Sequence, residues 1–196
     1  MRARTQPAPS AAALADHYTG GHDRRALGWM HDARITTAIT LARFLLDGQT
    51  PERVADLSCG APHAEVARAF HAPTTILSDL APGIVDHHGP IEDTIHLLDG
   101  TMVDLFICLE TLEHLADPDT VLREIRGRAR HLVCSLPIWD RPEDELNGEH
   151  LWVFDRAGGE QMLRDAGWNP VLYAEVPAGP ATGPCGSYQC ATWGCS

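Results

Sequence analysis

The sequence lacks an apolar run that approaches the about 20 residues needed to cross a bilayer, so we expect no membrane-spanning helix. Basic residues are also scarce: 15 Lys and Arg stand against 27 Asp and Glu, which gives a formal net charge of −12 with His neutral. An acidic surface repels phosphate backbones, and nucleic acid is therefore not the expected partner. A chain of 196 residues is long enough for one domain, and we expect one active site.

We also expect neither an export signal nor a disulfide framework. The apolar stretch near the start, residues 11–15, is shorter than the about 7–15 residues of a secretory signal. Three of the six cysteines lie inside apolar segments and three near the C-terminus: Cys59, Cys108 and Cys134, then Cys185, Cys190 and Cys195. The last three lack the close C-x-x-C pairs of structural zinc sites, so we interpret them as free thiols and expect a reducing, cytoplasmic environment.

Segments of strand and helix type alternate along the chain. The expected strands are 54–57, 75–79, 103–109, 131–136, 171–176 and 188–193, and the expected helices are 29–46, 63–70, 119–129 and one between Asp155 and Gly167. Strands that are apolar on both faces are typical of a parallel sheet with helices on each side. We therefore predict an α/β fold with a doubly wound, mostly parallel, Rossmann-like sheet. The last two strands have no helix between them, which predicts an antiparallel C-terminal strand.

Acidic residues close the first two of these strands. Asp56 ends the first strand, Gly60 lies in the turn before the next helix, and Asp79 ends the second strand. At the carboxyl ends of parallel strands such a turn brings a ligand to a helix N-terminus, and an acid there can accept hydrogen bonds from two ribose hydroxyls. The pattern indicates a nucleoside cofactor. The turn, residues 58–63, lacks the Gly-x-Gly-x-x-Gly fingerprint that suits a pyrophosphate, so an NAD-dependent oxidoreductase is the weaker interpretation.

Four segments resemble the successive strand motifs of class I S-adenosylmethionine-dependent methyltransferases: Val54–Gly60 (VADLSCG), Ile76–Asp79 (ILSD), Val103–His114 (VDLFICLETLEH) and Leu132–Pro137 (LVCSLP). The resemblance covers roughly residues 50–196. It implies a cofactor-binding methyltransferase domain at 51–196, preceded at 1–50 by an N-terminal arm and a helical cap. We expect the arm, up to about residue 15, to be loosely held.

The resemblance also assigns roles in cofactor binding. It implies that Asp56 and the backbone of Ser58–Gly60 hold the methionine end of S-adenosylmethionine. Asp79 would hold the ribose diol, and Glu92 or Asp93 would lie in the adenine region. The full implied set is Asp56, Ser58, Cys59, Gly60, Asp79, Leu80, Glu92, Asp93 and Leu109. Ser58 and Pro62 depart from the glycines of many members, and Pro62 lacks an amide donor, which would weaken binding if relatives use that amide.

A second polar motif follows the most apolar strand, 103–109. If the chain turns helical there, Glu110, Glu113 and His114 at i, i+3 and i+4 share one face. Two crowded carboxylates raise each other's pKa unless a cation lies between them, and a divalent metal would relieve the repulsion. His150, in the loop after a later strand, can share the same crevice. We therefore predict a metal site formed by Glu110, Glu113, His114 and His150.

The spacing Glu-x-x-Glu-His followed by a later His is similar to that in two branches of the family: ubiquinone-type catechol O-methyltransferases and enzymes that 2′-O-methylate small-RNA 3′ ends. The similarity implies a divalent ion that binds two adjacent substrate oxygens and lowers the pKa of the one to be methylated. Mg²⁺ is the implied ion, and two imidazoles also suit Mn²⁺, Co²⁺ or Zn²⁺. Two alternatives stay open: a metal-free site in which His114 is the general base beside Glu113, or a purely structural trio.

These features predict a soluble methyltransferase that uses S-adenosylmethionine and acts on an oxygen, or less favourably a nitrogen, of a small molecule or nucleoside-like acceptor. The expected catalytic residues are Glu113, His114 and His150. The acidic charge favours small acceptors over RNA. Two other functions remain: a non-catalytic protein that binds S-adenosylmethionine or a nucleoside, and 2′-O-methylation of a nucleic-acid terminus.

Overall fold

The computed structural model describes residues 1–7, 10, 13, 28–81, 85, 87–100, 102–139, 150–176 and 189–196. For residues 28–31 and 61–63 it describes the backbone alone. Within these ranges, none of the helices has the length and apolar character that a membrane span requires.

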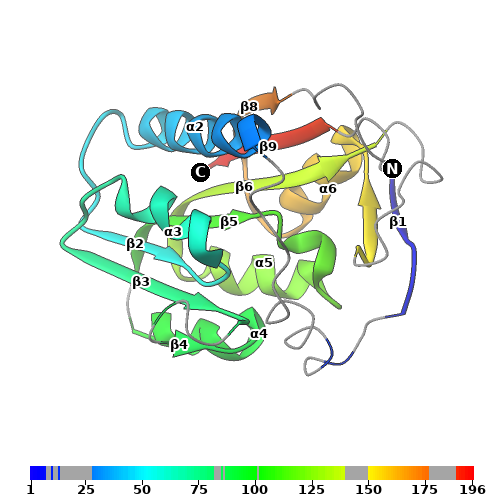
Figure 1. Cartoon of the computed structure of the whole chain (residues 1–196), viewed down its shortest axis with the longest axis horizontal. Coiled ribbons are helices and arrows are strands. Elements are labelled where there is room, and N and C mark those ends of the chain that lie inside the picture. Colours follow the sequence, from blue (N-terminus) through cyan, green and yellow to red (C-terminus); the bar gives the residue numbers. More distant parts are fainter. Residues whose placement is uncertain are drawn as a thin grey trace.

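One mixed sheet organises the chain (Figure 1). Its central strands run in the order β4 (His87–His88), β3 (Thr74–Asp79), β2 (Arg53–Asp56), β5 (Val103–Leu109), β6 (Ala129–Ile138), β9 (Gln189–Cys195) and β8 (Pro170–Val176). The strands from β4 to β6 are parallel, whereas β9 is antiparallel to both β6 and β8. The predicted mostly parallel, Rossmann-like sheet with an antiparallel C-terminal strand is therefore confirmed.

Helices cover both faces of the sheet (Figure 1). The helices α2 (Gly28–Leu45) and α3 (Gly60–Arg68) pack with Leu105 and Ile107 of β5 in one apolar cluster. The other face of β5, with Phe106 and Cys108, packs with α4 (Ile91–Thr94), the 3-10 helix η2 (Ile95–Leu98), α5 (Pro118–Arg126) and α6 (Arg156–Asp165). The strands are apolar on both faces because each face is buried by helices.

Local sequence signals set the bounds of two helices. The side chain of Asp117 accepts a hydrogen bond from the Thr120 amide at 3.0 Å, and α5 begins at the next residue, Pro118. Asp155 caps α6 in the same way through the Gly158 amide at 2.7 Å. The helix ends before Gly167, whose φ of +87° lies in the left-handed region that favours glycine. The predicted cap and stop of α6 are both confirmed.

The N-terminal residues form an edge strand, and the expectation of a loosely held arm is wrong for residues 1–7. Strand β1 (Arg2–Arg4) pairs antiparallel with β7 (Trp152–Phe154), which in turn pairs with the carboxyl end of β6. The physical reason is a pair of side-chain contacts. The Arg2 guanidinium lies 4.2 Å from the centre of the Trp152 ring, and its Nη1 lies 2.6 Å from Asp119 Oδ2.

Candidate active site

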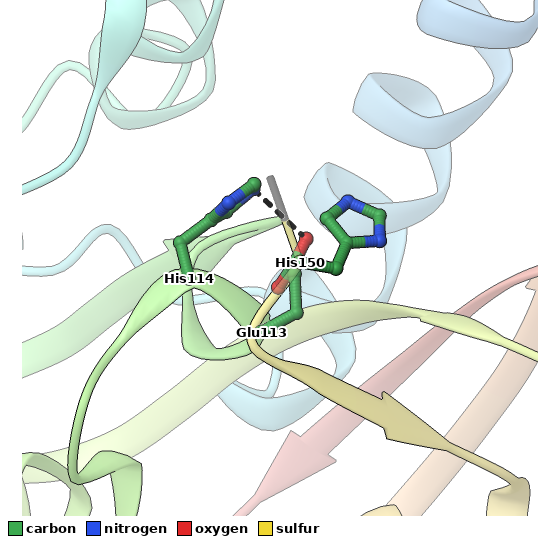
Figure 2. Close-up of side chains that lie close together, drawn as sticks. All are labelled: Glu113, His114 and His150. Atoms are coloured by element: carbon green, nitrogen blue, oxygen red, sulfur yellow. Dashed lines mark ion pairs between the residues drawn. The ribbon is translucent and has the colours of Figure 1, made fainter. Parts of the chain in front are cut away.

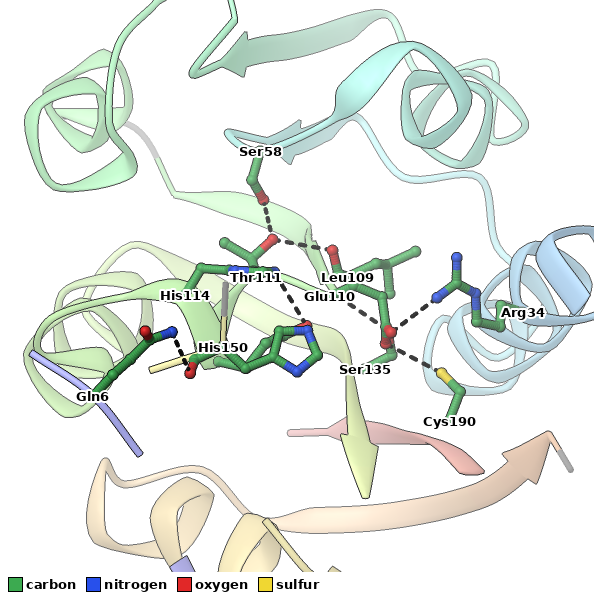
Figure 3. Close-up of polar contacts among 11 residues, drawn as sticks. Gln6, Arg34, Ser58, Leu109, Glu110, Thr111, His114, Ser135, His150 and Cys190 are labelled. Carbon is green, nitrogen blue, oxygen red and sulfur yellow. Dashed lines mark hydrogen bonds and ion pairs between the residues drawn. The ribbon is translucent and has the colours of Figure 1, made fainter. Parts of the chain in front are cut away.

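The candidate site lies where the strand order reverses, at the carboxyl ends of β2 and β5. The chain passes from β2 to β3 on one side, and β5 pairs with β2 on the other side. Ligands of open α/β sheets bind in the crevice outside such a switch point. The two loops meet there, since the Thr111 hydroxyl donates a hydrogen bond to Ser58 Oγ at 2.8 Å (Figure 3).

Asp56 supplies a buried carboxylate at the end of β2. Its Oδ1 accepts a hydrogen bond from the Ser58 amide at 3.2 Å, whereas Oδ2 is buried with no hydrogen-bond partner among the described residues. Burial raises the pKa of Asp56 well above its ordinary value, the Ser58 amide opposes that rise, and the nearby Asp79 carboxylate adds to it. A ligand with a cationic N–H group would therefore gain from binding at Asp56.

Asp79 ends β3 and orders the same turn. Its two carboxylate oxygens accept hydrogen bonds from the Gly60 amide at 2.6 Å and from the Ala81 amide at 2.9 Å. Gly60 itself has a φ of +47°, a conformation that favours glycine. The structure thus brings the ends of β2 and β3 together as expected. Each oxygen of Asp79 retains a second lone pair for a further donor.

The remaining cofactor candidates lie around this turn. Cys59 is buried, and burial together with Asp56 and Asp79 raises its pKa to about 12, so it stays a thiol at neutral pH. The others are a half-buried Leu80, a buried Leu109 at the end of β5, and the exposed Glu92 and Asp93 on α4. Pro62 falls in the first turn of α3, where backbone amides have no partner within the helix, so the fold tolerates it without loss.

Three of the four predicted metal ligands converge. One ligand atom from each of Glu113, His114 and His150 lies within 4.8 Å of the other two (Figure 2). His114 Nε2 is 3.7 Å from Glu113 Oε1. The rings of His114 and His150 meet edge to face, with 4.9 Å between their centres and 72° between their planes. We call these three residues the Glu–His–His cluster.

The Glu113 carboxylate is the most unusual group of the cluster. It is fully buried, and neither of its oxygens has a hydrogen-bond partner in the described part of the chain. Burial raises the pKa of Glu113 to about 8, and repulsion from Glu110 contributes to the rise. A buried, unpartnered carboxylate beside two imidazoles is a donor set that suits a divalent transition metal. It also suits general acid–base chemistry.

Glu110 does not join this cluster, and the expected single helical turn from 110 to 114 is wrong. Glu110 has a φ of +49°, and the 3-10 helix η3 (Leu112–His114) begins only two residues later. Glu110 Oε2 lies 2.8 Å from Arg34 Nη1 of α2, and the Ser135 hydroxyl donates to Oε1 at 2.7 Å. The left-handed backbone turns the side chain towards Arg34, which offers a full opposite charge (Figure 3).

The protonation of Glu110 follows from these partners. Burial alone would raise its pKa, but Arg34, the Ser135 hydroxyl and the Cys190 thiol at 3.2 Å bring the pKa below its ordinary value. Glu110 is therefore a carboxylate, whereas Glu113 is near its midpoint at slightly basic pH. The two glutamates share one motif in the sequence and have opposite electrostatic environments in the fold.

The sequence gives no signal for several residues that complete the site. Arg34 is one polar position in a predicted helix, and Ser135 is one residue of an apolar strand. Cys190 is a free thiol, as predicted, and it donates a hydrogen bond to Glu110 Oε1. Cys185 lies outside the described residues. The N-terminal residues Thr5 and Gln6 contact the backbone of His150, a contact that only the β1–β7 pairing creates.

No family model and no curated protein matches the sequence. Solved structures do match. The N-methyltransferase NodS from Bradyrhizobium japonicum WM9, in complex with S-adenosylhomocysteine, has a TM-score of 0.66 and 14% identity over 95% of this chain and 98% of its own. The 1,6-didemethyltoxoflavin-N1-methyltransferase from Burkholderia thailandensis, with bound 1,6-didemethyltoxoflavin and S-adenosylhomocysteine, has a TM-score of 0.64. It is 16% identical over 100% of this chain and 95% of its own.

The chain has the fold of S-adenosylmethionine-dependent methyltransferases. The fold does not by itself decide the reaction, because the [4+2]-cyclase SpnF matches with a TM-score of 0.67 and 14% identity over 96% of this chain and 97% of its own. The activity must therefore be argued from the site.

Proposed function

We propose that this chain is an S-adenosylmethionine-dependent methyltransferase that methylates an oxygen of a small molecule. The observation that carries the proposal is the buried carboxylate of Glu113, which accepts no hydrogen bond from the described residues and lies beside two imidazoles. This carboxylate is set next to a nucleoside-type turn at the switch point. The first feature can activate an acceptor, and the second can hold a methyl donor. The methyltransferase fold supports the choice of donor.

The residues around the turn fit the cofactor. The free oxygen of Asp56 would accept a hydrogen bond from the cofactor's ammonium group, with the backbone of Ser58–Gly60 beside it. The remaining lone pairs of Asp79 would accept from the ribose hydroxyls, and Glu92 and Asp93 on α4 would lie towards the adenine. When bound, S-adenosylmethionine supplies an electrophilic methyl group. In this proposal residues 51–196 form the cofactor domain, and residues 1–50 contribute a cap that includes Arg34.

The Glu–His–His cluster would activate the acceptor. The two unpartnered oxygens of Glu113 and the two imidazoles fit a divalent ion, which would lower the pKa of a bound hydroxyl. Mn²⁺, Co²⁺ and Zn²⁺ suit this donor set better than Mg²⁺, which prefers oxygen ligands. In the metal-free alternative, His114 takes the acceptor's proton and Glu113 stabilises the resulting imidazolium, because His114 Nε2 lies 3.7 Å from Glu113 Oε1.

The surface charge supports a small acceptor. A net charge of −12 disfavours long nucleic acids as substrates. The five cysteines that the structure describes are free thiols, which supports a reducing, cytoplasmic location.

Methyl transfer from labelled S-adenosylmethionine to a panel of catechols, diols and nucleosides tests this function, with Mn²⁺, with Mg²⁺ and with EDTA. We expect transfer to an oxygen acceptor that EDTA abolishes and Mn²⁺ restores. Glu113→Gln should lower kcat/KM by about 100-fold or more, because it weakens both metal binding and proton transfer, and should leave the S-adenosylhomocysteine Kd unchanged.

Glu124→Gln, on the exposed face of α5, is the matched control and should keep wild-type activity. Binding of S-adenosylmethionine without transfer to any acceptor would overturn the enzymatic function in favour of a binding protein. A Glu113→Gln variant as active as the wild type would overturn the role of the cluster.

A further inference from the structure

The segment that carries His150 has few sheet contacts of its own. His150 lies just before β7, and β7 pairs with β6 through the single register pair Ile138–Phe154. With β1 it forms three register pairs, from Arg2–Phe154 to Arg4–Trp152. Most of the strand pairing of β7 therefore comes from the N-terminus of the chain, about 150 positions away in the sequence.

Hydrogen bonds continue this ladder past the end of β1 as far as His150. The Thr5 amide donates to the Leu151 carbonyl at 2.9 Å. The Thr5 hydroxyl donates to the His150 carbonyl at 2.6 Å. The Gln6 side-chain amide donates to the same carbonyl at 3.0 Å (Figure 3). A carbonyl oxygen has two lone pairs, so the N-terminal segment uses the full acceptor capacity of His150.

The other side of the same backbone is tied to Glu113. The Leu151 amide donates to the Glu113 carbonyl at 2.8 Å. Residues 150–151 thus lie between Thr5 and Gln6 on one side and η3 on the other. Through one residue, Leu151, the N-terminal segment, His150 and Glu113 share a continuous set of backbone hydrogen bonds.

A glycine in α6 makes room for this arrangement. A Cβ atom at Gly158 would overlap the carbonyl of Met1, and the Met1 carbonyl oxygen accepts a hydrogen bond from the Asp155 amide at 3.0 Å. Glycine inside a helix is unfavourable relative to alanine. Its presence at this contact is a second observation, separate from the hydrogen bonds, that the chain is built for a docked N-terminus.

We propose that Thr5 and Gln6 are positioning residues, which hold the His150 imidazole against Glu113 and His114 through the His150 carbonyl. The proposal deepens the proposed function, because the cluster that they order is the one assigned there to acceptor activation. Outer-shell hydrogen bonds of this kind fix the orientation of a ligating side chain, and their loss weakens metal binding by about 10- to 100-fold.

The test uses the full chain and compares Thr5→Val/Gln6→Met with the wild type in two measurements. In the metal-free protein, the rings of His114 and His150 have their centres 4.9 Å apart. We expect the NMR cross-peak between their ring protons to be lost in the variant, because the released carbonyl would let His150 move away from His114. In a titration with Co²⁺ alone, followed by its visible absorption, the variant should bind at least about tenfold more weakly.

Two further variants separate positioning from a general loss of structure. Thr5→Ser keeps the hydroxyl and should show the ring cross-peak and the Co²⁺ affinity of the wild type. Thr40→Val removes a similar exposed hydroxyl, which donates to the Thr36 carbonyl at 2.7 Å within α2, and should change neither. A double variant that keeps the ring cross-peak would overturn the positioning role. If the wild type binds Co²⁺, a double variant that binds the ion equally tightly would also overturn it.

A wild type that binds no Co²⁺ would instead overturn the metal-assisted form of the proposed function. In that case the ring cross-peak alone still decides whether Thr5 and Gln6 position His150. The two failures are therefore distinguishable.

Discussion

The two halves of the site are built in different ways. The half proposed to bind the cofactor consists of Asp56, the turn that follows it and Asp79, which lie at the ends of neighbouring parallel strands and hydrogen-bond mainly to one another. The half proposed to activate the acceptor combines Glu113 from η3, His150 from the segment before β7 and Arg34 from α2. The N-terminal residue Thr5 adds a hydrogen bond to the His150 carbonyl. A site made from adjacent strand ends is fixed by the sheet, whereas one made from distant segments depends on every contact that docks them.

The Arg34–Glu110 pair offers the strongest way to disturb the acceptor half alone. Arg34→Met leaves the Glu110 carboxylate in a mostly buried position without its counter-charge and close to Glu113. We expect the free energy of unfolding to fall by about 2–3 kcal/mol, since removing one member of a buried pair strands the other charge. Urea unfolding measures this loss.

The matched control is Arg130→Met, which removes an exposed pair with Asp104 and should leave the urea midpoint almost unchanged. The S-adenosylhomocysteine Kd of folded Arg34→Met should stay near that of the wild type. A variant that loses cofactor affinity while it keeps its stability would show that the halves are not separate.

A smaller effect is expected where the N-terminus docks. Gly158→Ala would normally stabilise a helix by about 0.5–1 kcal/mol. Here the added methyl would push Met1 away, and we expect a net loss of about 1 kcal/mol with weaker Co²⁺ binding. Gly127→Ala is the control, because its methyl would meet no atom closer than the Glu124 carbonyl oxygen at 3.6 Å. A stabilised Gly158→Ala would contradict the docking of Met1 against α6.

The smallest effect concerns the cofactor half and depends on pH. Burial raises the pKa of Asp56 above the value of about 3.9 in an unfolded chain. Its contribution to stability is therefore complete below about pH 4 and is lost progressively as the pH rises towards the folded pKa. Asp56→Asn avoids that loss, so its stability relative to the wild type should increase steadily between pH 4 and pH 8. Thermal unfolding across this range measures the difference, and a constant difference would contradict the raised pKa.

The sequence predicts the placement of Asp56 and Asp79 at one edge of the sheet for a physical reason. A run such as 103–109 is apolar on both faces and so fixes a central strand, and the acids that end β2 and β3 then fall at the same edge of the sheet. The convergence of His114 and His150 also follows from this placement of loops. Helical spacing failed at Glu110 because a positive φ and the charge of Arg34 outweigh the local pattern. Strand β1 could not be predicted, since three residues carry no period and the partner strand lies about 150 positions away.

The most direct test of the account is a calorimetric titration of the wild type and of Asp56→Asn with S-adenosylhomocysteine. Asp56 Oδ2, which has no hydrogen-bond partner among the residues that the structure describes, is the clearest acceptor for the ammonium group of that ligand. We predict one molecule bound per wild-type chain and binding at least about tenfold weaker in Asp56→Asn, which loses a charge-assisted hydrogen bond. A wild type that binds no S-adenosylhomocysteine, or an Asp56→Asn variant that binds it equally well, would contradict the assignment of this turn as the cofactor site.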